Sequence, residues 1–214
     1  MSELEERMIN SKENHFFTWL GGLIGIEGLK VLKERYKLGT STIYNGLVSF
    51  PQIDAKGRLH RIKEMRYNPN NGKRSKMLGS QRWAFEKRLF PDMNLEQVYF
   101  GSHLIVGNDK PIALVESEKT ALVCSHFMSK FIWLATGSLG MLSNERCKHL
   151  RGRELFLFPD LGATEVWAKK TRYLKGFKGI KVSKYLEENA NEYNLKEGDD
   201  LADLFINELK NRNE

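Results

Sequence analysis

The chain has 214 residues, 41% hydrophobic and 29% charged, with a formal net charge of +7. This composition is that of a globular protein with one large or two small domains, and it excludes a low-complexity or fibrous chain. Only two cysteines are present, which excludes a disulfide framework and fits the cytoplasm. The longest uncharged apolar stretch, residues 16–26, is shorter than the ~20 residues that span a membrane, so we expect no membrane partner.

The first third of the chain predicts helices followed by antiparallel strands. Apolar residues recur at three- and four-residue steps within 3–38, and Gly21, Gly22, Gly25 and Gly28 predict a break into two helices. Gly39 stands where a helix C-terminal cap belongs. The period then changes to two, which predicts strands within 42–53 and 58–67, with turns at 54–57 and 68–72 and a basic loop over 72–82.

A basic stretch overlaps these strands. Eleven Lys and Arg face two acids between Lys56 and Arg88. Such a run is either a solvated surface or a binding surface for a polyanion, and the interleaved Tyr67, Trp83 and Phe85 either stack on bases or belong to the core. The candidate nucleic-acid-binding residues are Lys56, Arg58, Arg61, Lys63, Arg66, Lys73, Arg74 and Lys76.

From Tyr99 onward, short apolar strands alternate with helices. The strands are predicted at 111–116, 131–137, 154–160 and 179–186, and the helices at 118–128, 139–149 and 163–174. This alternation predicts a parallel sheet with helices on its faces. We therefore expect a helical and antiparallel basic accessory domain over 1–98 and an α/β domain over 99–214.

Two acids end predicted strands of this sheet. Glu116 ends the first strand and Asp160 ends the third. Ligands of open parallel sheets bind beyond the carboxyl ends of the strands, so both acids would face one crevice if their strands are neighbours. The alternative is that each acid only favours the start of the following helix.

The motifs "IALVESEKTAL", "WLATGSL", "LFLFPDLGA" and "GDDLADLF" resemble, in this order, a Toprim domain, the metal-binding fold of bacterial primases, topoisomerases and some nucleases. Within that family the chain is most similar to Toprim-like primase and mobilisation-associated proteins of bacterial mobile elements. The resemblance implies a parallel four-stranded sheet flanked by helices, preceded by a small α+β domain. It also implies Mg²⁺ or Mn²⁺ bound by a Glu after the first strand and an Asp-x-Asp after the third.

Carried onto this sequence, the family pattern makes Glu116 and Asp160 catalytic and metal-binding residues. The second Asp does not carry over, because Gly162 stands there. A single Mg²⁺ needs only one or two carboxylates beside waters and phosphates. Further acids for the metal are expected from the "GDDLADLF" stretch, in which the candidates are Asp199, Asp200 and Asp203. The structural alternative is that Asp200 and Asp203 cap a helix.

Three residues are candidates for phosphate binding. Lys119 lies in the first turn of the helix after Glu116, where it meets either a phosphate or solvent. Gly137 and Ser138 follow the second strand and form either an anion-binding nest or an ordinary turn.

These features predict a nucleic-acid-processing protein of bacterial replication or mobile-element transfer. The expected chemistry is primase-like, metal-dependent nucleotidyl or phosphoryl transfer on DNA, with single strands preferred. The expected protein partners are replication or mobilisation proteins. The alternatives are a non-catalytic Toprim-like DNA-binding module and, less favoured, a Toprim nuclease.

Overall fold

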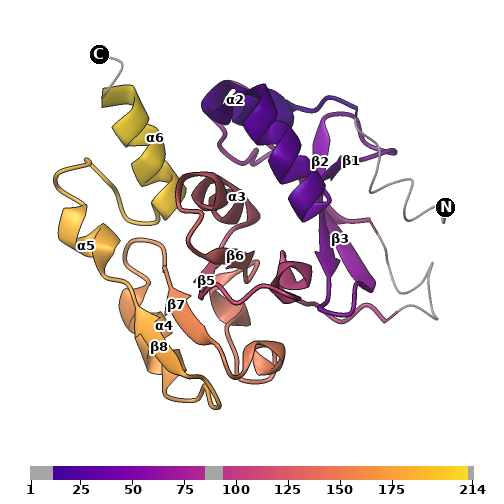
Figure 1. Cartoon of the computed structure of the whole chain (residues 1–214). Coiled ribbons are helices and arrows are strands. Elements are labelled where there is room, and N and C mark those ends of the chain that lie inside the picture. Colours follow the sequence, from indigo (N-terminus) through magenta and orange to yellow (C-terminus); the bar gives the residue numbers. More distant parts are fainter. Residues whose placement is uncertain (1–11, 85–93, 212–214) are drawn as a thin grey trace. The chain divides into compact units, whose positions relative to one another are not determined.

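The computed structural model describes residues 12–84 and 94–211 of the chain. It divides into two compact units, Met1–Val98 with Ser102–Leu104, and Tyr99–Gly101 with Ile105–Glu214. Each unit contains one four-stranded sheet (Figure 1). We refer to them as the antiparallel unit and the parallel unit.

The antiparallel unit begins with helix α2, His15–Tyr36. Asn14 starts it, because its side chain accepts a hydrogen bond from the Phe17 amide at 2.9 Å. Gly25 lies at φ 78° and kinks the helix, so the predicted break is confirmed at that glycine. The predicted cap at Gly39 is wrong: Lys37 adopts the left-handed conformation and ends the helix, and Gly39 already belongs to a strand.

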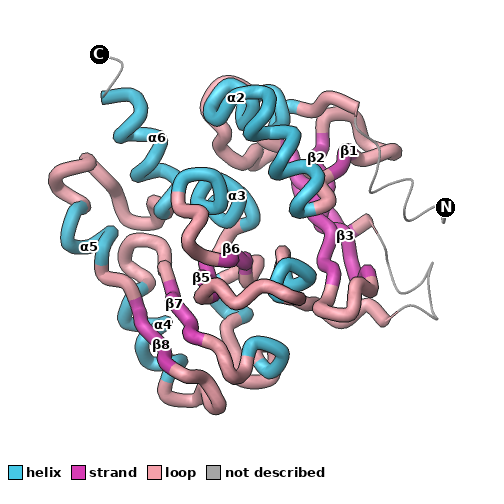
Figure 2. The backbone as a smooth tube through the Cα atoms, in the orientation of Figure 1, coloured by secondary structure: helices cyan, strands magenta, loops and turns pink. Residues whose placement is uncertain are grey.

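Four antiparallel strands follow in the order β1-β2-β3-β4, of which Figure 2 labels the first three. They are β1 Gly39–Thr40, β2 Leu47–Ile53, β3 Leu59–Arg66 and β4 Gln81–Trp83. Rings of Phe16, Phe50 and Tyr67 pack α2 against this sheet, with 4.7 Å between the ring centroids of Phe16 and Tyr67. Tyr67 is therefore a core residue, while Phe85 lies outside the described residues.

The parallel unit contains β5 Ile112–Val115, β6 Ile132–Ala135, β7 Glu154–Leu157 and β8 Gly179–Val182. All three pairings are parallel, and the order is β6-β5-β7-β8. The helices are α3 Glu118–Phe127, α4 Thr164–Thr171, α5 Tyr185–Asn189 and α6 Leu201–Asn211. The predicted fold class, a parallel four-stranded sheet flanked by helices after a small α+β part, is confirmed.

The order of the strands decides which helix covers which face. β6 and β8 lie on opposite sides of the central pair β5 and β7. Right-handed crossovers therefore place α3, which joins β5 to β6, and α4, which joins β7 to β8, on opposite faces. Helix α6 packs against α3, since the rings of Phe127 and Phe205 stack with centroids 5.3 Å apart.

Two predicted elements of the parallel unit differ from the structure. The helix expected over 139–149 is wrong: two 3₁₀ turns, Leu139–Met141 and Lys148–Leu150, stand there, and a third, Ser102–Ile105, precedes the sheet. Ser143 contributes to the interruption, because its hydroxyl accepts a local hydrogen bond from the Arg146 amide; the neighbouring Asn144 side chain accepts the amide of Lys175 in the loop after α4. The last strand ends at Val182, not at 186. Among the described residues, no helix combines the length and apolar character needed to cross a membrane.

Candidate functional site

The carboxyl edge of the parallel sheet brings the two predicted acids to one place. Strands β5 and β7 are neighbours, with Leu114 opposite Leu157, and the Phe158 amide extends the pairing by donating to the Leu114 carbonyl at 2.9 Å. Glu116 follows β5 directly, and Asp160 follows β7 after Pro159. Both acids therefore leave the sheet at the same edge.

Asp160 lies in a strongly anionic environment. Its pKa is raised from 3.8 to about 8, first because burial disfavours the charged form and then because Asp200 and Glu116 repel a further negative charge. Asp203 acts in the same direction, and Lys119 opposes it. Four carboxylates and one ammonium thus interact at this edge, which we call the acidic cluster (Glu116, Lys119, Asp160, Asp200 and Asp203).

Lys119 ties helix α3 to helix α6 inside the acidic cluster. Ser117 caps α3 by accepting the Thr120 amide at 3.1 Å, which places Lys119 in the first turn. Its Nζ lies 3.4 Å from Asp200 and 3.1 Å from Asp203. Burial acts to lower the pKa of Lys119, but the charges of the two Asp outweigh it and hold that pKa above its usual value.

Asp200 and Asp203 form a reciprocal cap on α6. One Asp200 oxygen accepts the amides of Ala202 and Asp203 at 2.8 and 3.1 Å, and Asp203 accepts the Asp200 amide at 3.1 Å. The other Asp200 oxygen accepts the Thr120 hydroxyl at 2.6 Å. The capping role considered for this stretch is therefore present. Thr120 was not among the sequence candidates, because only the fold brings it to Asp200.

Asp199 has a different environment from its neighbour. Its side chain accepts the Lys196 amide at 2.8 Å, and its carbonyl accepts the Leu161 amide at 2.9 Å. It is not among the main charges that shift the pKa of Asp160. Its contribution to a metal site stays a prediction.

Gly162 stands where the Toprim pattern has its second Asp. Its backbone conformation disfavours any residue with a side chain. Its φ is +89°, and a Cβ there would lie 3.3 Å from Cγ of Glu197. Glu197 comes from the loop before α6, which pairs with this turn through the Gly198 amide and the Leu161 carbonyl at 3.0 Å. The sequence pattern did not single out Glu197, because 35 positions of chain separate it from Gly162.

We expect Gly162→Asp to lower the free energy of unfolding by about 1 kcal/mol, because an L-residue at this φ is strained. Gly140→Asp is the control, since a Cβ at Gly140 meets open space at an ordinary φ; we expect its effect to stay within about 0.5 kcal/mol. Urea unfolding of both variants measures the difference. Equal stability of the two variants would contradict this interpretation.

The carboxylates of the acidic cluster are groups that bind divalent cations, but they are not arranged as a preformed metal site. In the part of the chain that the structure describes, no three His, Cys, Asp or Glu side chains converge as a metal-binding set. Lys119 pairs with Asp200 and Asp203, and the metal-binding role of Glu116 and Asp160 stays a prediction. Burial and then the charges of Asp200 and Glu116 raise the pKa of Asp160, and a Mg²⁺ ion between two carboxylates would relieve the repulsion between them.

The residues considered for phosphate binding are already engaged to different degrees. The Gly137 amide donates to the Glu116 carbonyl at 2.8 Å, and the ammonium of Lys119 contacts two carboxylates. Ser138 is exposed and begins the 3₁₀ turn at 139–141 without using its side chain as a cap. Their phosphate roles stay predictions.

In the antiparallel unit, three candidate basic residues share one concavity. Arg66, Lys73 and Arg74 line a hollow of about 300 Å³ together with His15 and Asn71. Lys73 and Arg74 are exposed, and Arg66 donates to the Asn45 carbonyl at 2.8 Å. We call these three residues the basic hollow.

The other basic candidates differ in how exposed they are and in whether their side chains already contact other residues. Lys63 is only 6% exposed, because β3 is buried on both faces around it, and its role in nucleic-acid binding stays a prediction. Arg58 pairs with Asp54 at 2.7 Å, and the Arg61 guanidinium lies over the Trp83 ring at 5.0 Å. Lys56 and Lys76 are exposed.

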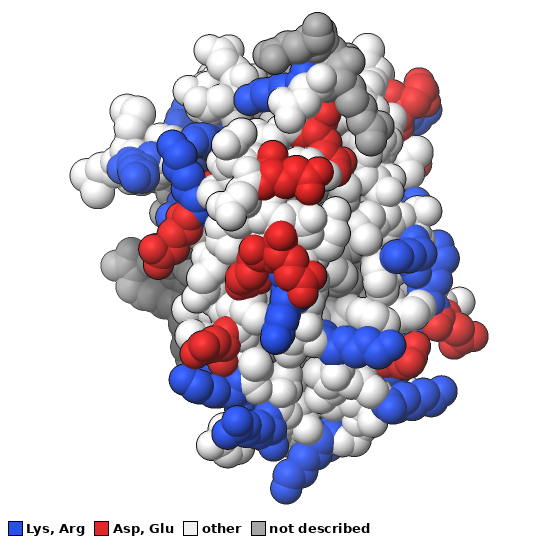
Figure 3. Space-filling view, turned by 90° about the vertical axis from the view of Figure 1, so that its left-hand side faces the viewer, with Lys and Arg blue, Asp and Glu red and all other residues white. Residues whose placement is uncertain are grey.

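The surface of the molecule on the side of α5 and β8 shows no field of a single sign. Figure 3 shows basic and acidic side chains interspersed there, with uncharged surface between them. A nucleic acid would not be held on this face by a broad positive field, which favours local sites instead.

Comparison with solved structures supports the fold assignment. The RNA polymerase domain of the Mycobacterium tuberculosis primase DnaG, in complex with a double-stranded DNA oligomer with a 6-nucleotide overhang, matches with a TM-score of 0.57 and 12% identity, over 94% of this chain and 72% of that chain. This likeness shows that the chain has the fold of a primase catalytic core.

More distant matches include the primase fragment of the bacteriophage T7 primase-helicase, with a TM-score of 0.47 and 14% identity over 72% of this chain. A DNA primase domain from Pseudomonas aeruginosa matches with a TM-score of 0.47 and 16% identity over 86% of this chain. The chain spans 60% and 56% of these two domains.

No curated protein matches the chain in sequence. A family model described as a domain of unknown function (DUF6371) matches residues 14–161, which is more than half of the chain. The chain therefore belongs to the DUF6371 family.

Proposed function

We propose that this protein performs primase-like, metal-dependent nucleotidyl transfer on a DNA template. The single observation that carries the proposal is the acidic cluster at the carboxyl edge of β5 and β7, in which burial and then the neighbouring carboxylates raise the pKa of Asp160 to about 8. The primase-core fold and the Toprim resemblance support the same chemistry.

In this proposal Glu116 and Asp160 hold the metal, and the rest of the cluster positions them. A bound Mg²⁺ or Mn²⁺ would supply Lewis-acid stabilisation of a phosphoryl oxygen. Without a cation, Asp160 keeps its proton near neutral pH. Once it is deprotonated, its carboxylate offers an oxygen ligand. Lys119 and Thr120 hold Asp200 through an ion pair at 3.4 Å and a hydrogen bond at 2.6 Å, and so fix the first turns of α3 and α6.

The template strand would be held by the antiparallel unit, which we propose as the accessory domain over residues 1–98, with the Toprim-like domain over 99–214. The basic hollow offers three cations from Arg66, Lys73 and Arg74 to backbone phosphates. The same proposal includes proteins of replication or mobile-element transfer as binding partners.

Replacing Lys73 and Arg74 together by Ala is expected to weaken binding of single-stranded DNA and to flatten its salt dependence. Each lost phosphate contact removes about 0.7 from the slope of log K against log salt, so the double variant should lose about 1.4. Fluorescence anisotropy of a labelled oligonucleotide over a salt series measures this slope. Lys30→Ala, an exposed lysine on α2, serves as the control, and an unchanged slope in the double variant would remove the basic hollow from the proposal.

A gel assay with single-stranded template, nucleotides and Mn²⁺ tests the activity itself. The proposal predicts extended primers with the wild type and none with Asp160→Asn. Shortened template instead of primers would indicate the nuclease alternative.

A second function, a non-catalytic DNA-binding module, is favoured by two observations. Gly162 replaces an acid of the family pattern, and no three-residue metal set is preformed in the described part of the chain. If the wild type and Asp160→Asn are equally inactive in the gel assay and bind DNA equally well, this second function holds.

A further inference from the structure

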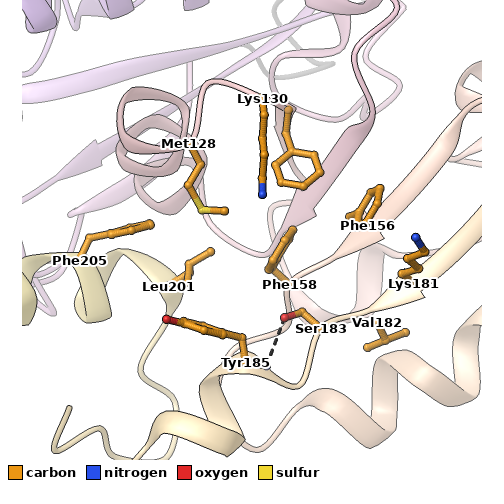
Figure 4. Close-up of a pocket in the computed structure, with 11 residues that line it drawn as sticks. Met128, Lys130, Phe156, Phe158, Lys181, Val182, Ser183, Tyr185, Leu201 and Phe205 are labelled. Carbon is orange, nitrogen blue, oxygen red and sulfur yellow. Dashed lines mark hydrogen bonds between the residues drawn. The ribbon is translucent and has the colours of Figure 1, made fainter. Parts of the chain in front are cut away.

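The parallel unit carries an aromatic cavity that the proposed function does not use. It has a volume of about 560 Å³ and lies over the face of the sheet that carries Phe156 and Lys181 (Figure 4). This volume is within the ~300–1,000 Å³ typical of small-molecule sites. The cavity is therefore large enough for one ligand with a planar ring.

The register of the sheet explains why this face is aromatic. Trp133, Ala113, Phe156 and Lys181 stand opposite one another across the four strands. Since side chains that are paired in register point to the same face, they form one row. The small Ala113 leaves the middle of the row open, and Phe131 packs there against Phe156 with ring centroids 5.0 Å apart.

Helices cover only part of this face. Met128, at the end of α3, and Phe205 of α6 form one wall of the cavity. Tyr185 of α5 lies across from Phe158 (Figure 4). Tyr185 is 42% exposed, and Phe156 and Phe158 are half-buried. A parallel sheet normally has both faces covered, so these half-buried rings mark a surface that is free to stack with another ring.

The charge around the cavity selects an anionic ligand. Lys130 and Lys181 both line it, with their ammonium groups 5.2 and 5.1 Å from the centroids of the Phe131 and Phe156 rings. No carboxylate is among the lining residues, and neither lysine has a carboxylate partner within residues 12–84 and 94–211. The hydroxyl of Ser183, which accepts the Tyr185 amide at 3.2 Å, also lines the cavity.

We propose that this cavity binds a nucleoside phosphate, either free or as one unit of a single strand, with its base stacked on Phe156, Phe158 or Tyr185 and its phosphate at Lys130 or Lys181. Aromatic rings beside cations are the combination that binds bases and phosphates together. The ring system favours a base over an aliphatic ligand, and the two lysines favour a phosphate over a neutral one. The proposal is independent of metal binding at the acidic cluster.

Photocrosslinking in EDTA locates the ligand without involving the proposed catalysis. The probes are 5-bromodeoxyuridine monophosphate and an oligothymidylate that carries one bromodeoxyuridine. Crosslinks at Phe156, Phe158 or Tyr185 are expected. Labelling by both probes would identify a mononucleotide site, and labelling by the oligonucleotide alone would identify a strand-binding site; both results support the proposal.

Affinity measurements on variants of the full chain complete the test. Lys130→Glu with Lys181→Glu should weaken binding of the labelling probe about tenfold. Lys169→Glu with Lys175→Glu, an equal charge change at exposed positions of α4 and the loop after it, should leave the affinity unchanged. Tyr185→Ala removes an exposed ring without opening the core and should cost about fivefold.

Crosslinks confined to residues 12–84, or equal affinities of the cavity and control variants, would overturn the proposal. Loss of primer synthesis by Asp160→Asn with unchanged crosslinking would separate this site from the acidic cluster. The two proposals can therefore fail independently.

Discussion

Asp160→Asn is expected to abolish primer synthesis and, at the same time, to stabilise the metal-free fold. The native pKa of Asp160 is about 8, against 3.8 for the ordinary group. At 1.36 kcal/mol per pKa unit, keeping this carboxylate ionised in the native state costs on the order of 5 kcal/mol. Asn keeps the shape and removes the charge.

The pH dependence of stability has a definite sign. Between pH 4 and 8 the native state holds a proton on Asp160 that the unfolded chain has lost, so the wild type loses stability as the pH rises through this range. Asp160→Asn lacks this loss. Urea unfolding of both proteins in EDTA should give similar stabilities near pH 4 and the largest advantage of the variant above pH 8. Parallel pH profiles for the two proteins would show that the folded state does not raise the pKa of Asp160.

Lys119→Met is expected to destabilise the parallel unit by about 3 kcal/mol. The ammonium lies between Asp200 and Asp203 with its side chain only 12% exposed, and removal of one partner leaves buried carboxylates uncompensated. The pKa of Asp160 should rise further, because Lys119 is the charge that lowers it. Urea unfolding measures the stability, and carboxyl chemical shifts followed by NMR measure the pKa.

Two controls separate the charge of Lys119 from general effects of substitution. Lys119→Arg keeps a cation beside Asp200 and should retain most of the stability. Lys169→Met removes the exposed partner of Glu165, 3.9 Å away, and should cost less than about 0.5 kcal/mol. A loss in Lys119→Met no larger than in Lys169→Met would show that the ion pairs do not hold α3 and α6 together.

The sequence was sufficient where local chemistry decides the structure. The apolar runs around Leu114 and Leu157, each followed by an acid, predicted parallel strands with acidic ends, and the structure places these strands side by side. Gly25 interrupts α2 because its φ is positive, a conformation that the glycine pattern allowed.

The remaining features depend on contacts between distant segments. Lys63 belongs to a basic run, yet tertiary packing buries it, and periodicity within β3 alone could not show that both faces are covered. Glu197 and Thr120 reach Gly162 and Asp200 only after the loop before α6 packs on the sheet edge. The 3₁₀ turns within 139–150 replaced a predicted helix, and within this segment the Ser143 hydroxyl binds the Arg146 amide while Asn144 binds the distant Lys175 amide.

A crystal of the wild-type protein soaked with Mn²⁺, with the anomalous signal of the ion recorded, tests the metal site most directly. We predict a peak that contacts carboxylate oxygens of both Glu116 and Asp160, and no such peak in Asp160→Asn crystals soaked in the same way. A soaked wild-type crystal without a peak between these two side chains, or with a peak that persists in Asp160→Asn, would contradict the account.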